Sequence, residues 1–449
     1  MKILLITTGG TIVSEKGLDG EGLAPSKNGA ALFEKLFEAS GINGQQSIPG
    51  SEARRKLGNL RSPSSVCREM AEIEICSLFL KDSSNINPDD WILIIKKIFE
   101  NKDLFDGFII THGTDTMAYT SSILSYVLGA LEKPVILTGS MIPATWTLRS
   151  APRHGCYYPG LVTGRKTCKA RAKRAPAASH PESDAKYNLV NSFKFMRVLI
   201  EKGQGGVSIC FNGKLMHGTR VKKIDSATWM LRPCAAAREC AQQNVQSTSK
   251  ASAGAAAGDA FVSVSYDDIG VVTSGNAEIT AAPFIDKVGL ARFGESFSFN
   301  TIDSIRFERN IISLKLFPGF SADYFGKILD IKPLAIIIES FGAGGLPFMG
   351  ENLLPMVEQA QLLDIIVVVS AQCLKGGVDL SLYEVGQRAA EAGAVSAHDM
   401  TYEAAVTKLM WLLAQVPAKK AKELFVHNFC DELSLPKFSD CREGHTGCV

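Results

Sequence analysis

The sequence predicts an α/β protein with two domains. The larger N-terminal domain should have a mainly parallel sheet with helices on both faces, and the C-terminal domain should be a smaller α/β unit. Short apolar runs alternate with helical patterns of ten or more residues, which is typical of right-handed βαβ units. The chain has 449 residues, more than one ordinary domain holds, and 46% of them are hydrophobic. At least two hydrophobic cores are therefore expected.

In the N-terminal half, short apolar runs predict strands, and longer segments with apolar residues at helical spacing predict helices. The predicted strands are 2–7, 72–79, 106–111, 134–138 and 206–212. The predicted helices are 31–39, 88–100, 115–131 and 187–201. The two sets alternate along the chain, so each pair of successive strands can lie parallel with a helix crossing between them.

The C-terminal half repeats this alternation on a smaller scale. The predicted strands are 311–317, 334–339 and 365–370, and the predicted helices are 322–329, 352–362, 383–392 and 401–415. The apolar run IIVVV at 365–369 is far shorter than the roughly 18 residues that a membrane-spanning helix needs. No membrane-spanning segment is expected.

Three stretches interrupt the alternation and are expected to be disordered insertions. They lack an apolar period and are rich in Ser, Arg and Gly (44–70), in Arg, Lys, Pro and Ala (151–183), or in Ala, Gln, Ser and Gly (227–258). The basic middle stretch could instead be a nuclear-targeting or RNA-binding tract, but no aromatic stacking platform accompanies it. The resulting domain boundaries are 1–278, a linker at 279–308, 309–435, and a polar tail at 436–449.

The composition argues against several classes of partner. Lys and Arg total 48 against 46 for Asp and Glu, so no bulk charge attracts nucleic acid or an anionic membrane. An uninterrupted run of only four apolar residues precedes the first Thr-Thr-Gly-Gly segment, whereas a secretory signal needs about seven to fifteen. The eleven cysteines form no C-x-x-C pair, which argues against a disulfide framework and a structural zinc site. We expect a cytoplasmic protein.

The first strand ends in the segment 7–12, TTGGTI. Ligands of open parallel sheets bind beyond the carboxyl ends of the strands, and two glycines there allow the backbone to approach a ligand closely. Thr11 would then face the pocket. A plain tight turn explains this segment equally well, and a dinucleotide loop is disfavoured because G-x-G-x-x-G is absent.

Two further strand ends should meet the first at the same edge of the sheet. One is the segment 111–116, THGTDT, where Asp115 could also cap the following helix. The other is the segment 81–84, KDSS. Together they predict a pocket for a small zwitterion, whose carboxylate is held by hydroxyl and N–H groups and whose ammonium is held by Asp115.

A threonine nucleophile in this pocket would need a base, because its hydroxyl is unreactive at neutral pH. His112 enters a buried turn and is more typical of a hydrogen-bonded core residue than of a base. Lys223, at the end of the segment 217–223 (HGTRVKK), is the alternative if burial and neighbouring charges tune it. By composition alone it would be an ordinary surface lysine.

Several motifs resemble the bacterial-type L-asparaginase/glutaminase family, and within it the cytoplasmic type I L-asparaginase branch. The main motifs are TGGTI at 8–12, HGTDTMAYT at 112–120, PVILTGS at 134–140, and GTR at 218–220 followed by Lys223. The resemblance continues through FGAGG at 341–345, QC at 372–373, GGVD at 376–379, YEVG at 383–386 and KLMW at 408–411. It covers nearly everything except the three aperiodic stretches and the tail.

The resemblance implies a role for each candidate residue. Thr11 would be the nucleophile, and Thr114, Asp115 and Lys223 would form a second triad in which Lys223 activates Thr114 or a bound water. The substrate would be held by Asp82, Ser83 and Ser84 together with Thr114 and Asp115. Main-chain N–H groups of the two threonine loops would stabilise the oxyanion. No metal ion and no organic cofactor would be required.

Two positions depart from the pattern of many relatives. The segment 17–25 that follows the first threonine reads GLDGEGLAP, with Leu23 where many relatives carry a tyrosine, so Thr11 lacks a hydroxyl partner there. Its glycines, among them Gly20 and Gly22, still suit a closing lid. Gly345 replaces an asparagine that other branches send toward the neighbouring subunit's pocket.

The expected activity is hydrolysis of L-asparagine to L-aspartate and ammonia by a homodimer or homotetramer. Two alternatives within the family are a glutaminase and an ammonia-supplying amidotransferase subunit. The latter usually carries an extra N-terminal module, whereas this sequence starts directly at the first strand. A binding-only amino-acid sensor is a third alternative, but it should have lost the nucleophile or the lysine.

Overall fold

A computed structural model describes residues 1–16, 23–25, 72–144, 183–226, 260–281, 285 and 305–434. The predicted helix at 31–39, nearly all residues of the three aperiodic stretches, most of the linker and the polar tail lie outside the described residues. Each of the other predicted helices and strands is present, with ends that differ by a few residues.

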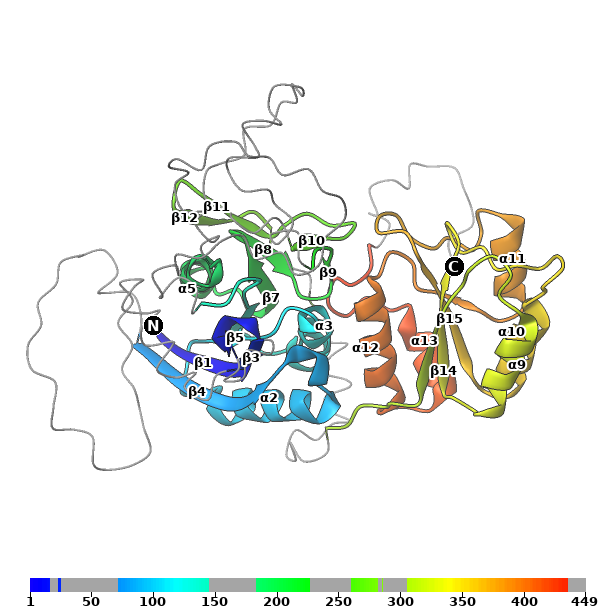
Figure 1. Ribbon diagram of the computed structural model, residues 1–449, viewed down its shortest axis with the longest axis horizontal. Coiled ribbons are helices and arrows are strands. Elements are labelled where there is room, and N and C mark those ends of the chain that lie inside the picture. Colours follow the sequence, from blue (N-terminus) through cyan, green and yellow to red (C-terminus); the bar gives the residue numbers. More distant parts are fainter. Residues whose placement is uncertain are drawn as a thin grey trace, which may run out of the picture.

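An eight-stranded sheet forms the N-terminal part of the chain (Figure 1). Five strands pair in parallel, in the spatial order β7 (Gly206–Phe211), β6 (Pro134–Thr138), β5 (Gly107–Thr111), β1 (Lys2–Gly9) and β4 (Glu72–Lys81). Three antiparallel strands extend it beyond β7, namely β8 (Lys214–His217), β11 (Gly270–Thr273) and β12 (Asn276–Ile279). The parallel part matches the prediction, and the antiparallel extension was not foreseen.

Helices cover both faces of this sheet. Helices α2 (Pro88–Asn101) and α3 (Met117–Leu128) pack on one face, and α5 (Ala185–Glu201) packs on the other. A capping box at Asn87 fixes the start of α2. The N-cap of α3 is Thr116, so the predicted helix start at Asp115 is wrong, and Asp115 does not cap the helix. Its carboxylate instead contacts a lysine from another strand, as described below.

The C-terminal part of the chain has a four-stranded parallel sheet. Its spatial order is β13 (Ile311–Lys315), β14 (Ala335–Ser340), β15 (Ile366–Ala371) and β16 (Val395–Ser396). One face carries α9 (Ala322–Asp330), α10 (Leu354–Leu362) and α11 (Glu384–Glu391), and the other carries α12 (Tyr402–Leu413) and α13 (Ala418–Phe425). Helix α13 and strand β16, which has only two residues, were not predicted.

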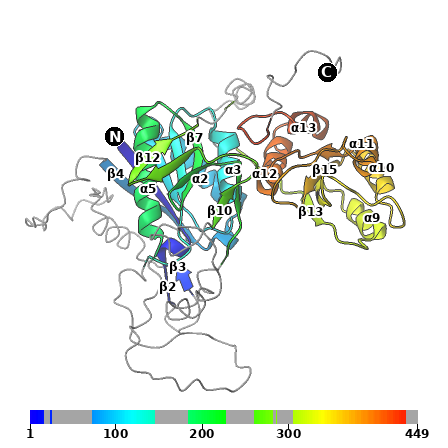
Figure 2. The same ribbon diagram turned by 90° about the horizontal axis from the view of Figure 1, so that it is seen from above.

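Helix α12 joins the two parts of the molecule by packing against α3, as both views show (Figures 1 and 2). The ring of Trp411 stacks on that of Tyr126, with centroids 5.4 Å apart, and the Tyr126 hydroxyl donates to the Ala404 carbonyl at 3.2 Å. One hydrophobic cluster therefore runs from the N-terminal sheet through α3 and α12 to the C-terminal sheet. None of the described helices combines the length and apolar character needed to cross a membrane.

Candidate active site

Glycines bring the ends of three parallel strands into direct contact. A Cβ atom on Gly10, after β1, would lie 2.5 Å from the Cα of Gly113, after β5. A Cβ atom on Gly113 would lie 2.5 Å from the Oγ of Ser83, after β4. Gly10 also has a φ of +78°, which favours glycine. The structure therefore brings together the three strand ends that the sequence analysis expected to converge.

Lys223 reaches this edge from strand β9 (Val221–Lys223), which pairs with β10 (Phe261–Ser263) outside the main sheet. Its ammonium donates to Thr114 Oγ1 at 2.8 Å and to Asp115 Oδ1 at 2.6 Å. The Lys223 side chain is 16% exposed, whereas that of Asp115 is 55% exposed. The lysine is thus held against a buried threonine hydroxyl, with a carboxylate open to an incoming ligand.

Ser83 links the β4 end to the same group. Its Oγ accepts the backbone N–H of Asp115 at 3.3 Å and lies 3.5 Å from Asp115 Oδ2. Asp82 and Ser84 are exposed, and the Asp82 carboxylate accepts the Ser84 N–H at 2.9 Å as the N-cap of a short 3-10 turn, Ser83–Asn85. The structure therefore places Ser83 in the cluster and leaves Asp82 and Ser84 at its exposed rim.

Thr11 opens the 3-10 turn Thr11–Val13 directly after the two glycines and is partly exposed. The turn is fixed by Ser14, whose hydroxyl donates to the Gly10 carbonyl at 2.9 Å. The Thr8 hydroxyl donates to the Thr111 carbonyl at 2.9 Å and ties the ends of β1 and β5 together.

The predicted lid falls mostly outside the described residues, including Gly20 and Gly22. Leu23 begins the short strand β3 (Leu23–Pro25) and pairs with Lys16 of β2 (Ser14–Lys16). The backbone that follows Thr11 therefore includes two short antiparallel strands, Ser14–Lys16 and Leu23–Pro25, and the role of this segment as a lid stays a prediction.

His112 is fully buried and hydrogen-bonded through both ring nitrogens. Nδ1 lies 2.7 Å from the Gly113 carbonyl, which can only accept, so this nitrogen carries the proton. Nε2 lies 2.9 Å from Thr120 Oγ1, which also accepts the indole N–H of Trp91. Burial lowers the pKa of His112 to about 4. The ring is a neutral core group at pH 7, in agreement with the interpretation drawn from the sequence.

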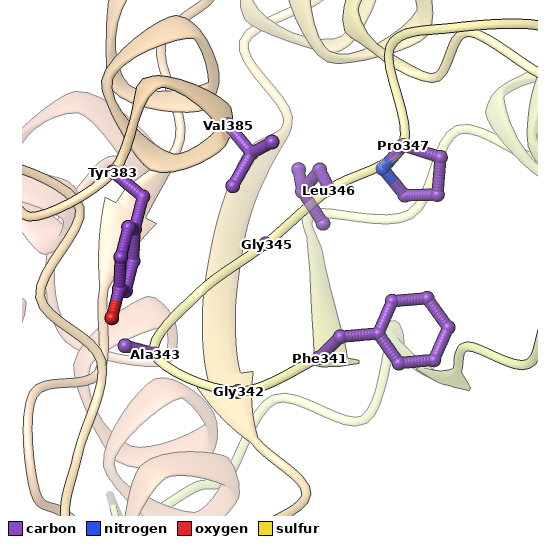
Figure 3. A pocket seen from close by; sticks show the side chains of 8 residues that line it. All are labelled: Phe341, Gly342, Ala343, Gly345, Leu346, Pro347, Tyr383 and Val385. Carbon is purple, nitrogen blue, oxygen red and sulfur yellow. The ribbon is translucent and has the colours of Figure 1, made fainter.

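A separate cavity of about 360 Å³ lies in the C-terminal part of the molecule (Figure 3). The loop after β14, from Phe341 to Pro347, forms one side, and Tyr383 and Val385 at the start of α11 form the other. Gly345 belongs to this lining. The lining has no carboxylate, amine or imidazole, so the acid–base groups expected for catalysis are found at the N-terminal sheet edge instead.

The arrangement at the sheet edge is suited to hydrolysis of an amide carried by a zwitterion. It combines two threonine loops, an exposed carboxylate and an amine that donates to one of the hydroxyls. Within the described residues, no group of three or more His, Cys, Asp or Glu side chains could hold a metal ion. One buried residue near Lys223 was not singled out by the sequence analysis. Arg220 is fully buried, and its only sequence signal was its place in the GTR motif.

Comparison with known proteins gives a consistent family assignment. The family model "Asparaginase, N-terminal" matches residues 2–154 and 175–231, and "Glutaminase/Asparaginase C-terminal domain" matches residues 310–425. The chain is 32% identical to L-asparaginase of Thermococcus kodakarensis, over 97% of this chain and 99% of that protein. It is 29% identical to L-asparaginase 1 of Escherichia coli K12, over 75% of this chain and 77% of that protein. The solved structure of the T. kodakarensis thermostable L-asparaginase aligns with a TM-score of 0.65 at 30% identity, covering 97% of this chain and 100% of that chain.

Proposed function

The chain belongs to the asparaginase family, and we propose that it is an L-asparaginase that hydrolyses L-asparagine to L-aspartate and ammonia with Thr11 as the nucleophile. The observation that carries the mechanism is the contact of the Lys223 ammonium with both Thr114 and Asp115. A threonine hydroxyl needs a positioned acid–base group to react at neutral pH, and this lysine is the amine held at the threonine loops.

In the first half of the reaction, the Thr11 oxygen adds to the side-chain amide carbon of the substrate. The hydroxyl proton of Thr11 is transferred to neighbouring polar groups. The negative charge that develops on the substrate oxygen is stabilised by main-chain N–H groups of the threonine loops. The amide nitrogen takes up the proton released from Thr11, and collapse of the intermediate breaks the carbon–nitrogen bond. Ammonia leaves, and an ester to Thr11 remains.

In the second half, a water molecule hydrolyses the ester. Thr114 and Lys223 act together on this water, because the Thr114 hydroxyl accepts from the lysine and can exchange a proton with it. The water oxygen bonds to the ester carbon, the bond to Thr11 breaks, and L-aspartate leaves. The Thr11 hydroxyl regains its proton, which restores the enzyme.

The substrate is held through its backbone end. The exposed Asp115 carboxylate receives the α-ammonium, and the Ser83 hydroxyl lies beside that carboxylate. Asp82 and Ser84, at the rim of the same group, contribute further polar contacts to the ammonium and the α-carboxylate. The proposed steps draw on Thr11, Thr114, Lys223, main-chain N–H groups and water, and they require no metal ion or organic cofactor.

The enzyme acts in the cytoplasm as a homodimer or homotetramer, as its resemblance to the type I branch implies. Large apolar side chains are exposed in the two segments that line the C-terminal cavity: Tyr383 (59%) is part of the lining, Leu382 (57%) precedes it, and Met349 (81%) follows Pro347 by two residues. Grouped apolar exposure of this kind is typical of protein interfaces, and it supports contact with a second copy. Light scattering on purified protein would give the number of subunits.

The test of the activity is ammonia release by purified protein from L-asparagine and from L-glutamine. Asparagine should be hydrolysed faster. Equal or faster release from glutamine would overturn the type I assignment and favour the glutaminase alternative. Binding of either amide without ammonia release would favour the amino-acid sensor.

A further inference from the structure

Arg220 is a fully buried charged side chain located three residues before Lys223. Its guanidinium is held in three directions. Nη1 donates to Asp399 Oδ2 at 2.8 Å, Nη2 donates to Ser434 Oγ at 3.2 Å, and Nε donates to the Asp431 carbonyl. The guanidinium carbon also lies 5.3 Å from the centroid of the Tyr266 ring. Because the guanidinium is a rigid planar fork, these contacts restrict the backbone segment that carries Arg220.

The partners of Arg220 come from two segments of the C-terminal part of the chain. Asp399 lies just before α12, and Asp431 and Ser434 lie after α13. The two segments are also joined to each other, because the Ser434 N–H donates to Asp399 Oδ1 at 2.9 Å. Arg220 therefore connects the approach to the catalytic lysine with the other half of the molecule.

The segment after α13 is itself rigidly held. Lys408 of α12 and Glu432 form an ion pair of 2.5 Å in which both side chains are fully buried. The Glu432 carboxylate also accepts the backbone N–H groups of Phe429 at 3.1 Å and of Cys430 at 2.6 Å. The surface presented to Arg220 is thus a fixed one rather than a loose tail.

The backbone beside Arg220 is anchored to the same surface. The Thr219 hydroxyl donates to the Cys430 carbonyl at 2.9 Å, and the Thr401 hydroxyl donates to the Thr219 carbonyl at 3.2 Å. On the other side, the Arg220 carbonyl accepts the Val264 N–H at 2.7 Å. Because β9 starts directly after this anchor, the position of Arg220 determines where Lys223 enters the site.

We propose that Arg220 is a positioning residue for Lys223, and that the segment 428–434 acts on catalysis through it. This inference rests on the proposed function, because it concerns the lysine assigned to proton transfer. Arg220 touches neither Thr114 nor Asp115 in the contacts described, so it acts through the backbone of 221–223. The residues proposed to bind substrate lie on other loops, so loss of this anchor should lower kcat and leave KM nearly unchanged.

The test is the Arg220→Lys variant, with Arg197→Lys as the matched control. A lysine ammonium is a single charged point and cannot reproduce the planar fork that joins Asp399, Asp431 and Ser434. In the control, the same substitution is made at Arg197, which forms an exposed ion pair with Glu201 on α5. Misplacement of a catalytic group by about 1 Å costs roughly 10²-fold in rate. We expect kcat for asparagine to fall about 10- to 100-fold in Arg220→Lys, with KM within about 3-fold of wild type.

A milder variant and a measurement independent of activity keep the test decisive. Asp399→Asn retains an acceptor for Ser434 but removes the charge facing Arg220, and it should lower kcat in the same direction by a smaller factor. Hydrogen exchange should show lost protection in 218–226 and in the paired β10 for Arg220→Lys. The Arg197→Lys control should change neither rate nor exchange.

Unchanged kcat in both Arg220→Lys and Asp399→Asn would overturn the proposal, as would a loss of activity that only follows the unfolded fraction in a thermal melt. A failure of the proposed function can be told apart from a failure of the Arg220 proposal, because wild-type protein would then release no ammonia from asparagine. In that case the exchange measurement still decides whether Arg220 holds the 218–226 segment, and unchanged protection overturns the inference.

Discussion

Lys223 Nζ lies 2.6 Å from Asp115 Oδ1, although 107 residues separate the two positions in the chain. The same ammonium donates to Thr114 Oγ1 at 2.8 Å. Lys222, its neighbour on β9, lies on the opposite side of an extended segment, where successive side chains alternate. Burial raises the pKa of Glu403 on α12, and the positive charge of Lys222 counteracts that effect. The two lysines therefore face different surroundings.

Replacing each lysine with methionine should separate their roles. Lys223→Met keeps the length of the side chain and removes the amine, and loss of a positioned acid–base group typically costs about 10²- to 10⁴-fold in rate. Lys222→Met should stay within a few-fold of wild type. The measurement is ammonia release at saturating asparagine, with a thermal melt to verify folding. An inactive Lys222→Met together with an active Lys223→Met would reverse the assignment.

Gly113→Ala should reduce activity strongly, because the new Cβ would lie 2.5 Å from Ser83 Oγ and 2.6 Å from Ser83 Cβ. Relief of this clash requires the β4 and β5 loops to separate, and a shift of about 1 Å in such a site costs roughly 10²-fold. Gly326→Ala is the matched control, since its nearest neighbour is the flexible Met356 sulfur at 3.3 Å. Steady-state kinetics of both variants would test this, and near-normal kcat in Gly113→Ala would contradict it.

The parallel strands and their polar ends were predictable from the sequence because the information is local. Each run of apolar residues is contiguous, and the threonines and glycines follow directly after a run, as at Thr11 and Thr114. The carboxyl ends of parallel strands meet at one edge, so convergence followed from topology. The start of α3 was misjudged because aspartate is a common helix N-cap residue, whereas the carboxylate of Asp115 is bound to Lys223, 108 positions further along the chain.

The β9–β10 pair and the contacts of Arg220 could not be predicted from the sequence, because they depend on pairing between residues far apart in the chain. Strands β9 and β10 are three residues each, too short for a period, and they are stable only as a pair. The partners of Arg220 come from positions about 180 and 210 residues further along the chain. A buried arginine and a surface arginine look alike until those partners are known, so its role became visible only in three dimensions.

Lys408→Met should destabilise the protein more than Lys420→Met. Burial would raise the pKa of Glu432, but Lys408 and the backbone donors lower it overall. Burial also lowers the pKa of Lys408, and Glu432 opposes that shift. The 2.5 Å contact between the two groups favours the charged pair in the folded protein. Loss of one partner in a buried pair costs about 3–5 kcal/mol, whereas an exposed pair such as Lys420 with Glu423 is screened by solvent and contributes little. Urea unfolding would measure both.

The double variant Lys408→Met with Glu432→Gln should recover part of the loss. The amide oxygen can still accept from Phe429, and no unpaired charge remains in the core. A double variant less stable than Lys408→Met alone would show that the charge of Glu432 is required for another reason.

The protein should lose stability as the pH falls from about 6.5 to about 4. Burial lowers the pKa of both His112 and His217 to about 4. In the unfolded chain an imidazole titrates near 6.5, so between these values the unfolded state binds protons that the folded state does not. The stabilisation from each neutral ring is therefore fully present above pH 6.5 and decreases below it, by up to about 1.4 kcal/mol per pH unit for each histidine.

Urea midpoints at pH 8, 7, 6 and 5 would test this dependence on pH. We expect little change between pH 8 and 7, where an imidazole of the unfolded chain is mostly unprotonated, and a clear fall between pH 6 and 5. His217→Asn keeps a polar group near Thr219, which lies 2.9 Å from Nδ1 of the native ring. It removes one of the histidines whose pKa is lowered by burial, a group that also includes His398. The fall in the unfolding free energy between pH 6 and 5 should then be smaller than in the wild-type protein. A midpoint independent of pH down to pH 5 would contradict this prediction. It would mean that the rings are protonated in the folded protein although both are buried.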